Sequence, residues 1–190
     1  MKLILIRHGE TEHNVQRLCQ GQLDNKLSDK GVVQAKKLGK RFKNYKFDLI
    51  YSSDLTRAKD TAKEILKHHE KKELILDERL RERYFGKLQG KPFPKDFDWY
   101  NLPSHVESHE AIQKRVKEFF EDIYAQHKNK TVLVVFHGGA KRALISALYE
   151  NAPQKARELE KPKNTSVTEI NIKENKQHEL IINNCTKHLD

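Results

Sequence analysis

Two histidine–glycine pairs follow short apolar runs of the sequence. The first run, residues 3–6, leads to His8, and the second, residues 131–136, leads to His137. Runs of this length and composition predict buried strands. Ligands of open α/β sheets bind beyond the carboxyl ends of the strands, so both imidazoles are expected at one edge of one sheet. Since a neutral imidazole is a competent nucleophile near pH 7, the repeated pattern indicates chemistry rather than packing.

Two arginines stand where a bound anion would suit them. Arg7 directly precedes the first histidine, and Arg57 falls in the first turn of a helix predicted to begin after Ser53 or Asp54. A positive side chain at a helix N-terminus opposes the helix macrodipole, and a bound phosphate removes that conflict. The alternative is a surface arginine paired with Asp54 or Asp60. The position of Arg57 just after a predicted strand favours the phosphate role.

These motifs closely resemble those of the histidine phosphatase superfamily, the phosphoglycerate mutase-like proteins. The resemblance runs from about residue 3 to about residue 172 and includes the segments 53–58 and 80–90. It implies a catalytic set made of Arg7, His8, Arg57, Glu82 and His137. It further implies that His8 attacks phosphorus to form a phosphohistidine. Glu82 is then the proton donor to the leaving oxygen and afterwards the base that activates water.

Phosphoryl transfer also needs groups that neutralise the phosphoryl oxygens. The predicted phosphate-binding residues are Arg7, Asn14, Gln20, Arg57, His137 and Gly138. Asn14 and Gln20 lie in the long segment 7–27, where local loop capping is the alternative role of such side chains. We favour phosphate binding for Asn14 and leave Gln20 open between the two roles. Because arginine charge replaces a metal ion here, neither a metal nor a cofactor is expected.

The remaining pattern predicts an α/β protein, a three-layer α/β/α fold with a mostly parallel central sheet, phosphoglycerate mutase-like as the resemblance implies. Strands are expected at about residues 2–6, 47–51, 74–76, 131–136, 164–172 and 179–182, with a turn near 174–176. Helices are expected after Ser28, after Ser53 or Asp54, after Ser108, and over residues 139–149. The prediction is one domain, residues 1–190, with a proline- and aromatic-rich lid or substrate-specificity loop at about 84–106.

Composition limits the partners. The 190 residues are 36% hydrophobic and 34% charged, with a formal net charge of +10. Neither a zinc finger nor an aromatic RNA-binding motif accompanies the lysines, so a solvated basic surface is expected and nucleic acid is not. Cys19 and Cys185 are too few for a disulfide scaffold. A small phosphorylated metabolite is the expected partner of a cytoplasmic monomer or homodimer that binds no membrane.

The sequence leaves three alternative functions to be considered. A cofactor-dependent phosphoglycerate mutase would share the catalytic set, but Phe85 stands where mutases typically place tyrosine and His13 where they usually have tryptophan. The segment 91–106 also lacks their adjacent arginine pair, and residues 164–170 look more like the small phosphatases. A non-catalytic binding module that uses the basic surface is disfavoured because all five catalytic positions are filled. A histidine-based metallohydrolase lacks the expected ligand spacing.

Overall fold

One mixed sheet of six strands runs through the molecule, in the order β3-β2-β4-β1-β5-β6. The computed structural model describes residues 1–175 and 177–190. The strands are β1 (Lys2–Arg7), β2 (Leu49–Ser52), β3 (Leu74–Leu76), β4 (Thr131–Phe136), β5 (Val167–Asn171) and β6 (Glu179–Cys185). The first four run parallel, β5 is antiparallel to β1, and β6 is antiparallel to β5. The predicted mostly parallel sheet is therefore confirmed, while Lys176 of the expected turn lies outside the described residues.

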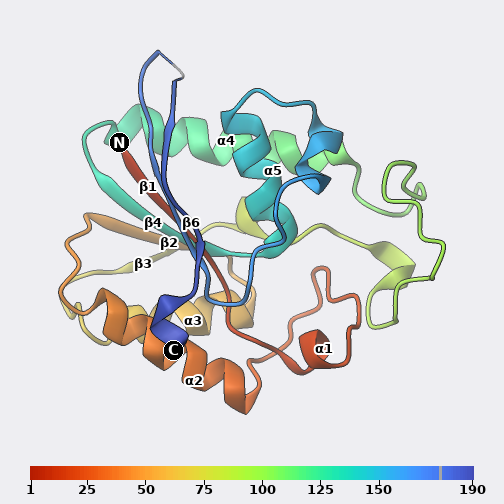
Figure 1. Ribbon diagram of the computed structural model, residues 1–190, viewed down its shortest axis with the longest axis horizontal. Coiled ribbons are helices and arrows are strands. Elements are labelled where there is room, and N and C mark those ends of the chain that lie inside the picture. The colour runs from red at the N-terminus through yellow and green to blue at the C-terminus, as the bar shows by residue number, and fades with distance from the viewer. Residues whose placement is uncertain (176) are drawn as a thin grey trace.

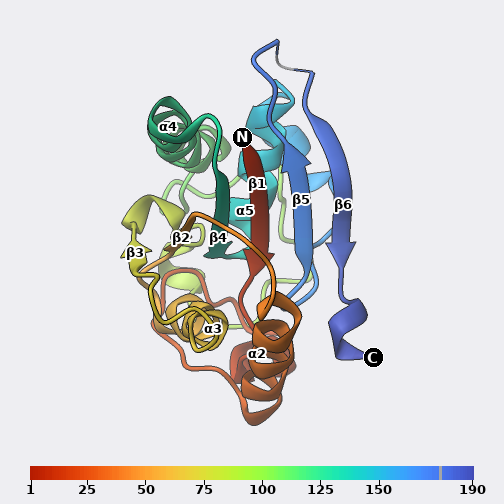
Figure 2. The ribbon, with the colours of Figure 1, turned by 90° about the vertical axis from the view of Figure 1, so that its left-hand side faces the viewer.

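Helices cover both faces of this sheet. They are α1 (Glu12–Val15), α2 (Asp29–Phe42), α3 (Thr56–Leu66), α4 (His109–His127) and α5 (Gly138–Leu148). The described residues also form short 3₁₀ turns, namely η1 (Glu78–Leu80), η2 (Gly86–Leu88), η3 (Pro153–Arg157) and, after the last strand, η4 (Lys187–Leu189). Figures 1 and 2 show α2 and α3 on one side of the sheet and α4 and α5 on the other. The predicted three-layer α/β/α architecture is confirmed.

The side-chain alternation of β1 explains why the sheet is covered twice. Leu3 and Leu5 point into the core shared with α4 and α5, whereas Ile4 and Ile6 point into the core shared with α2 and α3. All four are completely buried. Burial of one such side chain stabilises the fold by about 1.5–3 kcal/mol, so a continuous apolar run suits a strand between two helical layers.

The helix caps confirm two predictions and correct a third. Ser28 caps α2 and Ser108 caps α4, each through its side-chain oxygen. The N-cap of α3 is Leu55, not Ser53 or Asp54, and it makes no side-chain cap bond. Asp24 performs the capping from a distant loop, because its carboxylate accepts hydrogen bonds from the Thr56 amide at 2.6 Å and the Thr56 hydroxyl at 2.9 Å.

The segment 84–106 packs against the chain that follows α1. Leu18 and Pro92 form an isolated bridge, and the carbonyl of Cys19 accepts a hydrogen bond from the Gly90 amide at 2.7 Å. Aromatic rings hold the segment together through edge and tilted contacts, among them those of Phe85, Phe93, Phe97 and Trp99. The predicted lid is thus a segment with its own small apolar cluster; its closing function stays a prediction.

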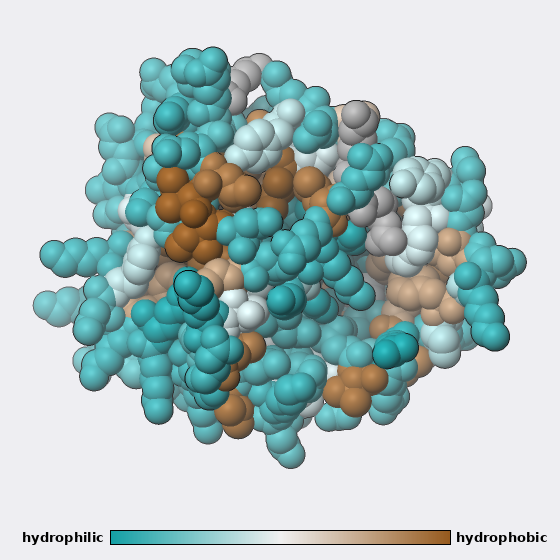
Figure 3. All heavy atoms as spheres, viewed as in Figure 1, coloured by the Kyte–Doolittle hydropathy of each residue, from teal (hydrophilic) through white to brown (hydrophobic). Residues whose placement is uncertain are grey.

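Hydrophilic side chains cover most of the face seen in Figure 3, as the high content of charged residues requires. None of the helices within residues 1–175 and 177–190 combines the length and the apolar character needed to cross a lipid bilayer.

Candidate active site

Three strand ends meet at one edge of the sheet. The His8 amide donates to the Phe136 carbonyl at 2.9 Å, which places the end of β1 beside that of β4. The Ser53 amide donates to the Val135 carbonyl at 3.0 Å, which adds the end of β2. The rings of His8 and His137 lie with their centroids 5.2 Å apart. The predicted meeting of the two imidazoles is confirmed.

The two imidazoles are bonded differently. Nδ1 of His8 lies 2.6 Å from the Gly9 carbonyl, which only accepts, so Nδ1 carries the proton and Nε2 keeps a free lone pair. Nε2 of His137 lies 2.9 Å from Oγ of Ser53, while its Nδ1 is buried without a hydrogen-bond partner. Burial lowers the pKa of both imidazoles well below its usual value, and the positive charge of Arg57 lowers it further. Both rings are therefore neutral at pH 7.

Backbone carbonyls hold both predicted arginines. Arg7 donates to the Pro162 carbonyl at 2.6 Å, and Arg57 donates to the carbonyls of Leu23 and Gly21, each at 2.7 Å. The Nε atom of each arginine is buried without a partner. Burial lowers the pKa of both guanidinium groups to about 10, so both stay charged at neutral pH.

The acidic alternative for Arg57 is wrong. Asp54 pairs with Arg81, and Asp60 pairs with Lys63 at 3.2 Å. Arg57 itself is completely buried and lines the central cavity. A buried arginine that lines a cavity and keeps one unbonded nitrogen is suited to an incoming anion.

Glu82 sits at the N-terminus of α5. Its carboxylate accepts hydrogen bonds from the amides of Gly139 at 2.9 Å, Ala140 at 3.1 Å and Arg83 at 2.8 Å. The fit at Gly139 is close, because a Cβ atom there would lie 2.3 Å from Oε1 of Glu82. Glycine at this position therefore lets the carboxylate reach the helix end.

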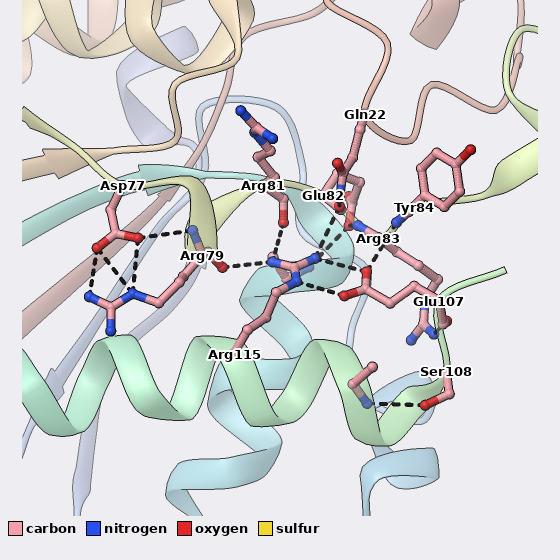
Figure 4. Close-up of polar contacts among 12 residues, drawn as sticks. Gln22, Asp77, Arg79, Arg81, Glu82, Arg83, Tyr84, Glu107, Ser108 and Arg115 are labelled. Carbon is pink, nitrogen blue, oxygen red and sulfur yellow. Dashed lines mark hydrogen bonds and ion pairs between the residues drawn. The ribbon is translucent and has the colours of Figure 1, made fainter.

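Arg115 of α4 fixes the backbone around Glu82 (Figure 4). Its guanidinium donates to the carbonyls of Arg79 at 2.6 Å, Arg81 at 2.7 Å and Glu82 at 3.1 Å. It also makes a two-pronged ion pair with the Glu107 carboxylate at 2.7 and 2.9 Å. Five donor contacts from one fork-shaped group hold the segment that presents Glu82 to the cavity.

Asn14 and Gln20 both line the cavity, and both are bonded locally. The Asn14 side chain accepts from the Thr11 amide at 3.2 Å in a capping box and from Nδ2 of Asn164, also at 3.2 Å. Oε1 of Gln20 accepts from the Thr11 hydroxyl at 2.9 Å. The structure thus shows a capping role for Asn14 and a local side-chain hydrogen bond for Gln20, and phosphate binding by the two side chains stays a prediction.

The cavity has a volume of about 440 Å³ and is lined by the eight predicted site residues except His137, whose ring lies beside that of His8. Sequence reasoning missed four further cationic or imidazole groups on its wall, Arg83, His109, Arg142 and Lys161. One signal for Arg142 was available, since it lies four residues after Gly138 and so on the same face of a predicted helix. Within the described chain, no three His, Cys, Asp or Glu side chains gather in a way that would hold a metal ion.

Comparisons with known proteins agree with this geometry. The profile of the histidine phosphatase superfamily (branch 1) matches residues 3–185. The chain is 36% identical over 181 residues to phosphoglycerate mutase-like protein 4 of Arabidopsis thaliana, which covers 87% of this chain and 77% of that protein. It is 33% identical over 190 residues to a metal-independent phosphoserine phosphatase of the same plant, and this alignment covers 92% of this chain and 78% of that protein.

A solved structure extends the similarity to three dimensions. The phosphoserine phosphatase of Entamoeba histolytica, in complex with 3-phosphoglyceric acid, superposes with a TM-score of 0.88 at 33% identity, covering 99% of this chain and 98% of that chain. The family profile spans nearly the whole sequence, and the two strand-end histidines lie together as the pattern of the strands predicted. The protein therefore belongs to the histidine phosphatase superfamily and is a hydrolase of phosphomonoesters.

Proposed function

We propose that the protein hydrolyses small phosphomonoesters without a metal ion, through a phosphohistidine on His8. The bond from Nδ1 of His8 to the Gly9 carbonyl is the observation that carries this proposal. It fixes the tautomer that leaves the Nε2 lone pair free, and burial keeps the ring neutral. A neutral imidazole with a fixed orientation is ready to attack phosphorus at physiological pH.

The phosphate group enters beside cations rather than beside a metal. The unbonded Nε atoms of Arg7 and Arg57 and the unbonded Nδ1 of His137 are buried at the same strand ends. Phosphoryl oxygens give each of these atoms the acceptor that it lacks. Positive charge placed before the reaction stabilises the charge that spreads over these oxygens in the transition state.

Glu82 supplies the proton for the leaving alcohol. Nε2 of His8 forms a bond to phosphorus as the ester P–O bond breaks, and the released oxygen takes the proton from the Glu82 carboxyl group. In the second half, the carboxylate takes a proton from water, whose oxygen attacks phosphorus and breaks the P–N bond. The products are the alcohol and inorganic phosphate, and His8 and Glu82 return to their starting states.

The substrate class follows from cavity size and from relatives. A cavity of about 440 Å³ accommodates a small metabolite. Two of the similar proteins are named as phosphoserine phosphatases, and one was solved with 3-phosphoglyceric acid. These names support a small phosphorylated metabolite as the substrate of this chain.

The test is phosphate release from a panel of phosphomonoesters in EDTA, with wild type beside His8→Ala. His68→Ala is the matched control, because His68 is exposed. We expect release that survives EDTA, is retained in the control and is lost in His8→Ala. Loss of release in EDTA that added metal restores would contradict metal independence. Conversion of 3-phosphoglycerate to its 2-isomer without net release would assign the protein to the mutases instead.

A further inference from the structure

Two further arginines line the same cavity as the catalytic residues. Arg142 follows the catalytic strand end by one turn of α5, and Arg83 follows Glu82 directly. Burial lowers the pKa of both Arg7 and Arg83, and the positive charge of Arg142 adds to the effect on each. Arg142 therefore lies within electrostatic reach of both.

The side chain of Arg83 is held in place by its contacts. Arg83 is 7% exposed, and its guanidinium donates to the Glu107 carbonyl and approaches Nδ1 of His109 at 3.2 Å. Nε2 of His109 in turn lies 2.8 Å from the Trp99 carbonyl. Figure 4 shows the Arg83 side chain turned toward the Glu107 backbone, away from the fork of Arg115. A guanidinium held in one orientation loses little entropy when it binds a ligand.

Arg142 has an unsatisfied donor. Its Nε atom is buried and has no hydrogen-bond partner. Arg7 and Arg57 have the same deficiency, which the substrate phosphate corrects in the proposed reaction. Arg142 lines the same cavity, so it offers an unpaired donor to a second acceptor group on the substrate.

Charge balance indicates the nature of that acceptor. Four arginines and Lys161 line the cavity, and Glu82 is the one carboxylate among the described lining residues. Glu82 is protonated when it serves as the proton donor, so a phosphate dianion leaves an excess of positive charge on this wall. A carboxylate on the substrate reduces that excess, and its planar shape matches the fork of a guanidinium.

We propose that Arg142 and Arg83 form a carboxylate subsite that selects phosphomonoesters whose alcohol part carries a carboxyl group. The proposal rests on the proposed function, because the subsite is defined relative to the phosphate bound at His8. Arg142 and Arg83 determine specificity; the bond changes take place at His8 and Glu82.

Matched substrates test the subsite. 3-Phosphoglycerate and glycerol 3-phosphate share a three-carbon skeleton and differ by a carboxylate in place of a hydroxymethyl group. O-Phosphoserine and O-phosphoethanolamine differ by the presence of a carboxylate. We expect wild-type kcat/KM to be at least about 10-fold higher for the carboxylate-bearing member of each pair, as charged hydrogen bonds of ordinary strength provide.

Variants assign this preference to the two arginines. Arg142→Gln and Arg83→Gln should each reduce the within-pair ratio about 10-fold, and Arg142→Lys should reduce it less because the charge remains. Arg79→Gln is the matched control, since Arg79 pairs with Asp77 and Asp122 outside the cavity. The two arginine sites differ in their structural contacts, so Arg142→Gln keeps the test valid if Arg83→Gln fails to fold.

The outcomes separate the two proposals. Release from 4-nitrophenyl phosphate with equal kcat/KM within both pairs would overturn the subsite and leave the proposed function standing. A preference that persists unchanged in Arg142→Gln would also overturn the assignment. No release from any ester would refute the proposed function, and the subsite with it.

Discussion

The two histidine–glycine strand ends look alike in sequence and differ in structure. Both imidazoles are buried at the carboxyl ends of neighbouring parallel strands. Nδ1 of His8 is bonded to the carbonyl of the next residue, whereas His137 is bonded through Nε2 to a serine from another strand end. One ring therefore presents a lone pair and the other presents a buried nitrogen that needs an acceptor. In the proposed mechanism, the same short motif supplies a nucleophile in one place and a phosphate ligand in the other.

The difference arises from what surrounds each ring. Gly9 supplies a carbonyl acceptor locally, so the tautomer of His8 depends on its own loop. The Gly9 amide donates a hydrogen bond to Oγ1 of Thr61 at 3.0 Å. Ser53 can donate its hydroxyl proton to Nε2 of His137, which leaves the proton of the neutral ring on Nδ1, as the proposed contact with a phosphoryl oxygen requires. Exchange of the two roles would require both partners to change.

Removing each of the two imidazoles in turn should give the largest losses of activity. His8→Gln should reduce kcat/KM on the order of 10⁴-fold or more, as loss of a covalent nucleophile does. His137→Gln should reduce it about 10²- to 10³-fold, the usual effect of removing one transition-state donor. Steady-state phosphate release measures both losses.

Trapping the intermediate separates the two roles. After brief reaction with a ³²P-labelled ester and denaturation, acid-labile and base-stable label should remain on His137→Gln and be absent from His8→Gln. Label on His8→Gln, or its absence from His137→Gln under single-turnover conditions, would contradict the assignment of His8 as nucleophile and His137 as phosphate ligand.

Sequence reasoning reached the strands and the paired histidines because those signals are local. The apolar runs before His8 and His137 bury completely, and parallel strands bring their carboxyl ends together. Partners from distant segments were not predictable, as Asp24 at the cap of α3 shows. The roles of the site residues, the single-domain extent 1–190 and the lid at 84–106 stay predictions.

The charged and polar contacts around the cavity were also not predicted from the sequence. Arg142 belongs to a helix whose amphipathic pattern says which face is buried but not that a cavity lies there. The bond between Ser53 and His137 joins residues 84 positions apart. Such contacts depend on strand order, which a single sequence constrains weakly.

A methyl group at Gly139 should disturb the proton donor while leaving both histidines in place. The Cβ of Gly139→Ala would lie 2.3 Å from Oε1 of Glu82, so the carboxylate must move. A displacement of about 1 Å at a reacting group can reduce kcat about 10²-fold. Helix stability should not fall, because alanine is favoured over glycine in a helix by up to about 1 kcal/mol.

Gly138→Ala is the steric comparison, since its Cβ would lie 3.5 Å from Nε of Arg7, an ordinary contact. Enzyme kinetics and thermal melting of both variants test the idea. Equal losses of activity in the two, or a lower melting temperature for Gly139→Ala, would show that backbone distortion rather than displacement of Glu82 is responsible.

Removing the Ser53 hydroxyl should test the difference in bonding between the rings of His8 and His137. Ser53→Ala deletes the hydrogen bond that selects the tautomer of His137, with an expected loss of about 10-fold in kcat/KM, equivalent to about 1.4 kcal/mol. Ser52→Ala is the matched control, because Ser52 is equally buried and its hydroxyl bonds the Ser53 carbonyl. A loss of the same size in Ser52→Ala would assign the effect to strand packing.

Acid should weaken the fold through the same two imidazoles. Burial holds the pKa of His8 and His137 well below the unfolded value of about 6.5, so the unfolded chain binds more protons as pH falls below that value. Their contribution is complete above pH 6.5 and is lost toward the lower folded-state pKa, at up to about 1.4 kcal/mol per pH unit for each ring. Melting temperatures from pH 7.5 to 5.0 should therefore fall less steeply in a His8→Gln/His137→Gln double variant than in wild type. His188, whose pKa burial lowers to about 4, contributes equally to both proteins. Parallel curves for the two proteins would mean that the buried pair does not set the acid limit of the fold.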